Sequence, residues 1–190
     1  MTEEELIQGC IKQDRRCQNS LYDKYYPLMS SIAFRYCSSH DEAMQAINMG
    51  YLKVFKNISA YDPTYSLATW MRKILVNQLV DEFRKSTQYE DKIDYSLEYD
   101  STYGVEINLA EAKWEEDELR TMLASLPKVT ETVFNLFAID GFKHKEIAEM
   151  LTISVGTSKW HVSDARKRLQ ELLTDRMSEK KEELTPNRHE

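Results

Sequence analysis

The sequence predicts an all-α protein made of two small helical domains that an acidic linker joins. Only 5 Gly and 4 Pro occur in 190 residues, too few for the many tight turns of a β-sandwich or barrel. Apolar residues make up 42% of the chain and recur at the spacing of helices that are buried along one face. A chain of this length forms one domain or two small ones.

The charge distribution divides the chain into four parts. Residues 1–85 carry 11 basic and 10 acidic side chains, a net charge of +1, and residues 119–174 carry 8 and 6, a net charge of +2. Between them, residues 86–118 carry 2 and 11, a net charge of −9, without sustained periodicity before about Asn108. The tail 175–190 carries 4 and 5 and is expected to fray. The total of −7 therefore reflects the predicted linker and does not exclude nucleic-acid binding by either domain.

In the first domain, the apolar pattern predicts three or four helices. Residues 43–55 carry the stripe of a buried helix, and Asp41 near its start suits the helix dipole. Pro63 disfavours a helical conformation at Asp62 and so ends this helix. A long helix is then predicted from about Leu67 to Lys85. That helix is largely apolar, and its polar strip comprises Lys73, Asn77 and Arg84, with Trp70 at the edge.

The second domain shows the pattern of a helix-turn-helix. Leu126-Pro127 opens a helix that Asp140-Gly141 ends, and residues 144–151 form a short amphipathic helix. A turn at residues 152–154 follows, in which Ser154 is placed to cap a last helix from Val155 to about Leu173. A short turn between a small amphipathic helix and a basic helix is typical of this motif.

Helical spacing assigns the last helix an inner and an outer face. The inner stripe comprises Ser158, Val162, Ala165, Leu169 and Leu172. Trp160, Asp164 and Lys167 lie opposite with Ser163 close by, while Lys159 and Arg166 flank one edge and His161 and Arg168 the other. The net charge over 159–168 is +3, and the hydroxyls and amides around Ser154 and Thr157 suit a phosphate. Two other interpretations stay open: a solvated basic face, and a Trp160 covered by a neighbouring helix.

Two blocks of the chain resemble a known family. Residues 21–85 include LYDKYYPLM and DEAMQAINMGYLKVFKNISAYDPTYSLATWMRKILVNQLVDEFRK, and residues 126–173 read LPKVTETVFNLFAIDGFKHKEIAEMLTISVGTSKWHVSDARKRLQELL. In this order, they resemble regions 2 and 4 of bacterial sigma factors of the extracytoplasmic-function group. Within the second block, the stretch GFKHKEIAEML and the later GTSK resemble members from the Bacteroidetes.

The resemblance implies partners and site residues. Region 2 would bind core RNA polymerase and capture unpaired bases of the minus-ten element, which here maps onto Tyr61, Tyr65, Trp70, Lys73, Asn77 and Arg84. Trp70 suits either base stacking or packing. Region 4 would bind the minus-thirty-five duplex through Ser154, Thr157, Lys159, Trp160, His161, Ser163, Arg166 and Lys167. An anti-sigma factor is a further partner that the family implies.

The chain departs from the family pattern at several positions. On the helix that would meet the polymerase, the family carries an acidic residue, then Gln and a second acidic residue, whereas this chain has Gln45, Asn48 and Met49. Thr152 occupies the place of a turn Gly, which costs some strain if its φ is positive, and Ser158 replaces a usual Val.

No catalytic constellation, cofactor motif or metal site is predicted. The four His and three Cys lack partners at metal-ligand spacing, and the chain has no Gly-rich phosphate loop. The absence of a signal peptide and of long apolar runs predicts a cytoplasmic protein. Three cysteines that cannot pair completely and form no CxxC motif predict reduced thiols, and the lack of a catalytic constellation predicts that the chain is not an enzyme. Two alternatives to a sigma factor stay open: a helix-turn-helix regulator with an N-terminal sensing or dimerising bundle, and a sigma-like protein with altered polymerase binding.

Overall fold

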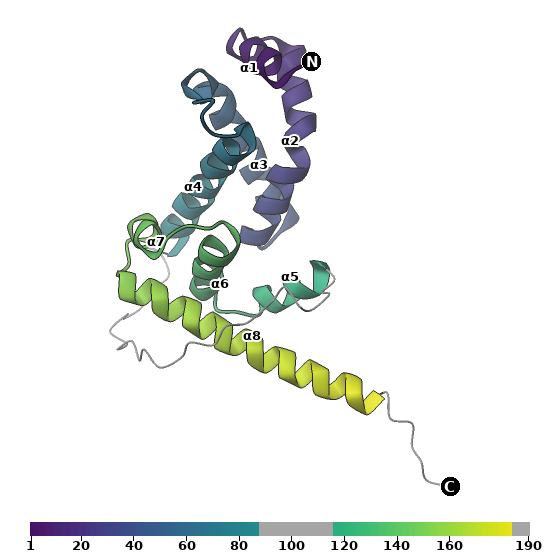
Figure 1. The fold of residues 1–190 in the computed structure, drawn as a ribbon, viewed down its shortest axis with the longest axis vertical. Helices are drawn as coiled ribbons and strands as arrows, with labels where there is room; N and C mark the ends of the chain where they lie inside the picture. The colour runs from purple at the N-terminus through teal and green to yellow at the C-terminus, as the bar shows by residue number, and fades with distance from the viewer. Residues whose placement is uncertain (88–115, 184–190) are drawn as a thin grey trace. The chain divides into compact units, whose positions relative to one another are not determined.

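A computed structural model of the chain describes residues 1–87 and 116–183, and every regular element in these ranges is helical (Figure 1). The all-α class is confirmed. The fold divides into two compact units, Met1–Lys92 and Ile93–Glu190. The segment 88–115, which holds most of the predicted acidic linker, lies outside the described residues, so the linker and the exact domain limits stay predictions.

The first unit contains four α-helices in its described part: α1 (Glu3–Ile11), α2 (Arg15–Tyr36), α3 (His40–Asn57) and α4 (Leu67–Thr87). A short 3₁₀ turn, η1 (Ile58–Ala60), follows α3. Side-chain caps define where three of the helices begin: Thr2 accepts from the Glu5 amide, Asp14 from the Arg16 amide, and Ser39 from the Glu42 amide.

The core of this unit lies where α2, α3 and α4 pack together (Figure 1). Gly50 on α3 lets the three helices pack closely, because a Cβ at this position would lie 2.9 Å from Leu75 Cδ1 on α4 and 3.0 Å from Met29 Cε on α2. Helix α1 packs against α2 and η1. Its Glu3 accepts hydrogen bonds from Tyr25 and, at 2.9 Å, from Lys24. The fully buried side chains that fill the core include Leu21, Met29, Ile32, Ile47, Val54, Leu67, Met71, Leu75 and Val76.

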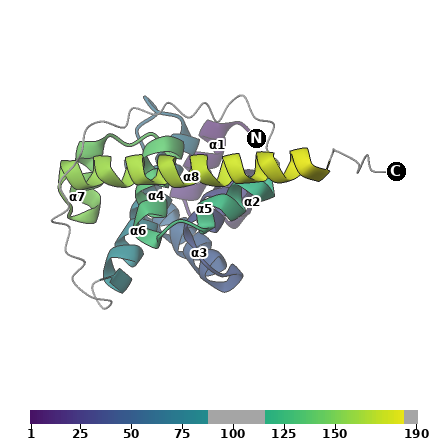
Figure 2. The same cartoon turned by 90° about the horizontal axis from the view of Figure 1, so that it is seen from below.

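The second unit contains α5 (Glu116–Ala124), α6 (Lys128–Phe134), α7 (His144–Leu151) and α8 (Val155–Glu183). Helix α6 continues as a π-helical turn, η2 (Asn135–Ile139). Figure 2 shows that α7 lies beside the first turns of α8, while α5 lies further along it. A hydrophobic cluster joins α5, α6 and α8 through Met122, Leu123, Leu126, Phe134, Ala165 and Leu169.

Two residues with positive φ bracket α7. Gly141, at φ +77°, ends the helical segment before it, as the sequence predicted. Thr152, at φ +58°, forms the C-cap of α7 and gives an amide hydrogen bond to the Ala148 carbonyl. The strain anticipated for a Thr at this position is therefore present.

Helix α8 runs to Glu183, ten residues beyond the predicted end at Leu173. The predicted end of the last helix is therefore wrong, whereas the fraying expected for the tail stays a prediction. The apolar stripe stops at Leu173, but the sequence that follows is rich in Glu, Lys and Arg, which have high helix propensity. Among the described residues, no helix combines the length and the apolar character that a membrane span requires.

Candidate nucleic-acid interface

The first turn of α8 is built by a side-chain cap. Ser154 Oγ accepts a hydrogen bond from the Thr157 amide at 2.9 Å and lies 2.8 Å from Thr157 Oγ1. The predicted cap is confirmed. Both hydroxyls lie at the positive end of α8, where an anion is electrostatically favoured.

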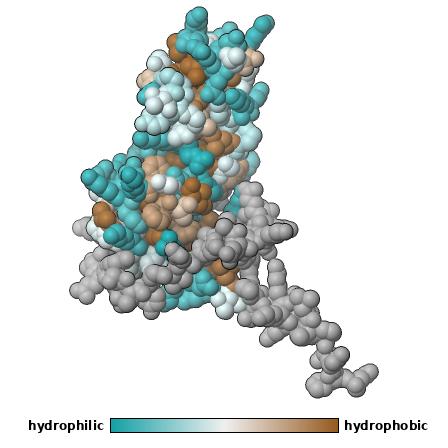
Figure 3. All heavy atoms as spheres, viewed as in Figure 1, coloured by the Kyte–Doolittle hydropathy of each residue, from teal (hydrophilic) through white to brown (hydrophobic). Residues whose placement is uncertain are grey.

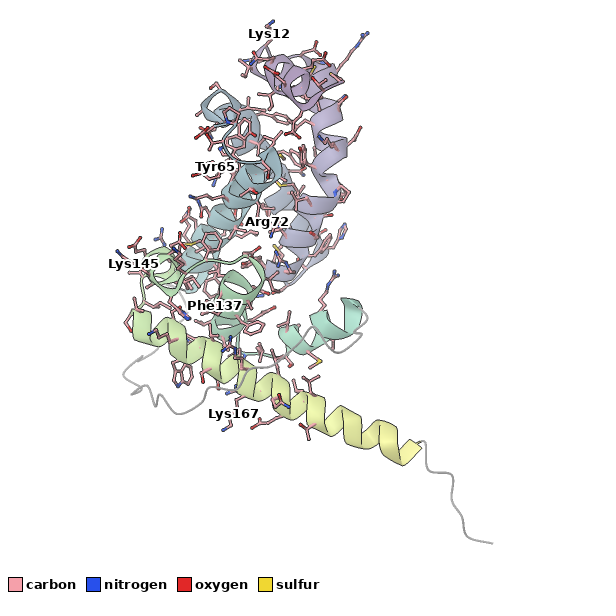
Figure 4. The ribbon with its side chains drawn as sticks, in the orientation of Figure 1. Lys12, Tyr65, Arg72, Phe137, Lys145 and Lys167 are labelled. Carbon is pink, nitrogen blue, oxygen red and sulfur yellow. The ribbon has the colours of Figure 1, made fainter. Side chains whose placement is uncertain are left out.

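The inner stripe of α8 is buried as predicted. Ser158, Ala165 and Leu169 are fully buried, Val162 nearly so, and Leu172 is half-buried. On the opposite side, Lys159 and Lys167 are exposed, and Trp160, Ser163 and Arg166 are half-buried. Figure 4 shows Lys167 projecting from α8 on the side away from α6.

His161 does not belong to this outer face. Its side chain is only 4% exposed, and its Nδ1 lies 2.9 Å from Thr130 Oγ1 on α6. Burial lowers the pKa of His161 below its usual range, although Asp164 nearby acts in the opposite direction. The placement of His161 at an exposed edge was wrong because helical spacing alone does not reveal the buried partner on α6.

The cations of α8 differ in their ion pairing. Arg168 Nε donates to Asp164 Oδ2 at 2.9 Å, which neutralises part of its charge locally. Within the described part of the chain, no ion pair engages Lys159, Arg166 or Lys167. These three cations are therefore available for phosphates or base edges.

The start of α7 adds two cations that the sequence reasoning missed. Lys143 and Lys145 are exposed on either side of His144, and hydrophilic side chains cover α7 on the face seen in Figure 3. Positive charge at the start of a helix is unfavourable with the helix dipole. Two lysines at this position in the sequence therefore indicate a role other than stabilising the helix. His144 itself is tied to α8, since its Nδ1 lies 3.0 Å from Ser158 Oγ.

In the first unit, the loop between η1 and α4 presents aromatic rings. Tyr65 is 63% exposed, and the Tyr61 hydroxyl donates to the Tyr65 carbonyl oxygen at 2.6 Å. The rings of Tyr61 and Trp70 meet edge to face with centroids 5.5 Å apart. Trp70 is half-buried, so it packs on Tyr61 while keeping part of its ring accessible.

The polar strip of α4 follows this loop. Lys73 and Asn77 are exposed, and Arg84 is half-buried with its Nη2 3.2 Å from Asp81 Oδ1. The structure therefore brings Trp70, Lys73 and Asn77 onto the half of α4 that adjoins the aromatic loop. Arg84 lies near the other end of the helix and is already paired.

The middle of α3 turns an uncharged patch outward, between the exposed Asp41 at its start and the exposed Lys56 at its end. Gln45, Asn48 and Met49 are all exposed, the last by 42%. Leu52, one turn further on and absent from the predicted set, is 44% exposed. Half-buried Phe55 extends this face, and its ring stacks on Tyr51.

The described residues contain no group of three or more His, Cys, Asp or Glu side chains arranged to hold a metal ion. All three cysteines are free thiols. Burial, with smaller contributions from Cys17 and Asp14, raises the pKa of Cys10 to about 11, so this thiol stays protonated and unreactive at neutral pH.

Comparisons with known proteins match the two halves of the chain to two parts of one family. The family model for sigma-70 region 2 matches residues 21–88, and the model for sigma-70 region 4 matches residues 116–169. The chain is 21% identical over 179 residues to the ECF RNA polymerase sigma-E factor of Haemophilus influenzae, covering 90% of this chain and 94% of that protein. It is 26% identical over 190 residues to the ECF RNA polymerase sigma factor SigW of Bacillus subtilis, covering 90% and 99%.

The fold also has a solved counterpart. The sigma factor RpoE of Bartonella quintana, crystallised with the anti-sigma factor NepR, superposes with a TM-score of 0.52 at 22% identity, over 82% of this chain and 96% of that one. Sigma factors bind RNA polymerase and promoter DNA and are regulators rather than enzymes. The chain therefore belongs to the extracytoplasmic-function group of the sigma-70 family and is an alternative sigma factor that directs promoter recognition and transcription initiation.

Proposed function

We propose that this sigma factor reads the minus-thirty-five element with the outer face of α8. The observation that carries the proposal is the division of α8 into a buried inner stripe and an outer face with three cations free of ion pairs among the described residues. Lys159, Arg166 and Lys167 would contact phosphates or guanine edges, and Ser154 and Thr157 would contact phosphate at the helix start. Trp160 and Ser163 lie on the same face, whereas His161 is excluded by its burial.

The minus-ten element would be held by the aromatic loop and the adjoining half of α4. Among the residues described, Tyr65 is the most exposed large apolar side chain after Met1, and its neighbours Tyr61 and Trp70 form an edge-to-face pair. A base unstacked from the duplex gains roughly 1–3 kcal/mol by stacking on such a ring. Lys73 and Asn77 would hold the adjoining backbone, with Arg84 further along once it leaves Asp81.

The outer face of α3 would bind core RNA polymerase. Gln45, Asn48, Met49 and Leu52 are exposed and uncharged, so the contact would depend on apolar burial and neutral hydrogen bonds more than on ion pairs. The NepR complex of the Bartonella protein makes an anti-sigma factor a reasonable regulator for this chain as well. The protein would act in the cytoplasm, without catalytic activity of its own.

The deciding experiment is binding of the full chain to core RNA polymerase from the source organism, followed by runoff transcription from promoter DNA. A stoichiometric complex that initiates transcription is the expected result. A stable dimer that binds paired half-sites and ignores the polymerase would instead favour a helix-turn-helix regulator.

Met49→Lys tests the polymerase face. The substitution leaves helix propensity almost unchanged but places a charge where apolar contact is proposed, so polymerase affinity should fall about tenfold or more. Gln8→Lys, a neutral-to-basic change at an exposed position of α1, is the matched control and should bind as the unaltered chain does. Equal affinities for both variants in a competition assay would place the polymerase contact elsewhere.

A further inference from the structure

His144 joins three elements at the start of the DNA-reading helix. Its Nδ1 lies 3.0 Å from the Oγ of Ser158, a fully buried residue of α8. On the other side, its ring stacks on Phe137 of η2, with centroids 4.3 Å apart and an interplanar angle of 15° (Phe137 is labelled in Figure 4). This one side chain therefore fixes α7 against both α8 and η2.

Two cations of α8, Lys159 and Arg166, act on the ring of His144. Burial, followed by Lys159 and Arg166 on α8, lowers the pKa of His144. His144 is also the first residue of α7, where the helix dipole disfavours a cation. On α7 itself, Glu146 accepts from the Lys143 amide at 2.8 Å and Lys145 adds further positive charge, while η2 presents the uncharged ring of Phe137.

The two α8 cations that act on His144 belong to the proposed DNA face. Lys159 and Arg166 lie seven residues apart, so they share one side of the helix. A phosphate bound there would offset their charge and remove the main electrostatic repulsion that a protonated His144 meets. The Ser158 hydroxyl can donate to a neutral ring or accept from a protonated one, so the hydrogen bond survives the change.

We propose that His144 is a positioning residue for α8, and that DNA binding at Lys159 and Arg166 is coupled to the uptake of a proton from solvent by its imidazole. The proposal rests on the assignment of DNA binding to α8. Because the linkage is reciprocal, DNA affinity should rise as the pH falls through the range in which histidine titrates.

The test measures binding of the full chain to a mixed-sequence duplex of about 25 base pairs at low salt, where phosphate contacts dominate. Between about pH 8 and about pH 6, the unaltered chain should bind roughly 2- to 4-fold more tightly at the lower pH, because the burial of His144 persists in the complex. His144→Gln keeps a hydrogen-bonding side chain but cannot titrate, so its profile should be nearly flat. His40→Gln, a change in the exposed histidine of the first unit, should retain the full pH dependence.

Ser158→Ala separates positioning from proton uptake. It removes the hydrogen bond but keeps the imidazole and both cations, so the duplex should bind more weakly at every pH with its pH dependence preserved. Calorimetry in two buffers with different ionisation enthalpies would measure the proton uptake directly, and His144→Gln should abolish it.

Three results would overturn the inference: a flat profile for the unaltered chain, an unchanged profile for His144→Gln, or no duplex binding at low salt. Runoff transcription distinguishes these from a failure of the proposed function. A chain that initiates transcription but shows no pH-linked duplex binding keeps its function and loses the role given to His144. A chain whose duplex binding depends on pH through His144 but which does not support runoff transcription keeps the role given to His144 and loses the proposed function.

Discussion

At the scale of single residues, the backbone on both sides of α7 is left-handed but carries different residue types. Gly141 adopts φ +77° with open space around the position of a Cβ, whereas Thr152 adopts φ +58° with a β-branched side chain. The left-handed conformation costs an L-residue roughly 1–2 kcal/mol relative to the right-handed one, and glycine avoids that cost. The turn of the helix-turn-helix therefore stores strain that the preceding loop does not.

Thr152→Gly should stabilise the second unit by about 0.5–1 kcal/mol, since the relief of strain exceeds the entropy that glycine adds to the unfolded chain. Gly141→Ala should have the opposite effect, a loss of about 1 kcal/mol, because it places a Cβ at positive φ. Urea unfolding of the two variants measures both values. Destabilisation by Thr152→Gly would mean that the threonine side chain makes a compensating contact.

Single residues also mark where sequence reasoning fell short. Ser158 looked like a small loss of apolar area, but its hydroxyl is the buried partner of His144, fourteen residues earlier. His161 looked exposed, but its partner Thr130 lies thirty-one residues earlier on α6. Helical spacing within one segment identifies the buried face of a helix. Whether a polar residue at the border of that face is buried depends on hydrogen-bond partners from distant elements.

At the scale of elements, α8 is the helix whose behaviour the sequence predicted best. Its apolar stripe, its cap and its outward lysines follow from spacing and chemistry that lie within the helix itself. Its end was misplaced, because the stripe that packs on α5 and α6 stops before the helix does. The limits of the acidic linker, in contrast, stay predictions.

Lys167→Ala and Arg168→Ala form a matched pair on this helix. Lys167 is exposed and in no ion pair among the described residues, so its loss should weaken duplex binding and lower the salt slope by about 1. Arg168 is paired with Asp164, so its loss should change the slope less. Titrations of each variant at several salt concentrations provide the comparison. Equal slopes for the two variants would contradict the orientation assigned to the outer face.

At the scale of the whole molecule, the described residues form two units with separate hydrophobic cores. In the first, α2, α3 and α4 meet around Gly50; in the second, α5, α6 and α8 meet around Ala165 and Leu169. Both cores are formed by helices that are consecutive or nearly consecutive in the chain. Because each core is formed within one stretch of chain, the apolar patterns of residues 21–85 and 126–173 could each predict a helical unit separately.

Gly50→Val should destabilise the first unit alone. The added side chain would collide with Leu75 and Met29, and overpacking of this kind costs typically 1–3 kcal/mol. Hydrogen exchange followed by mass spectrometry on the full chain should show faster exchange in α2, α3 and α4, with α6 and α8 unchanged. Equal acceleration in both units would show that they unfold together.

The helices of each hydrophobic core come from one continuous stretch of chain, and this has an evolutionary consequence. After gene duplication, substitutions on the outer face of α8 change residues that belong to neither hydrophobic core. A copy could thus acquire a new set of target genes through a handful of surface changes while inheriting its first unit intact.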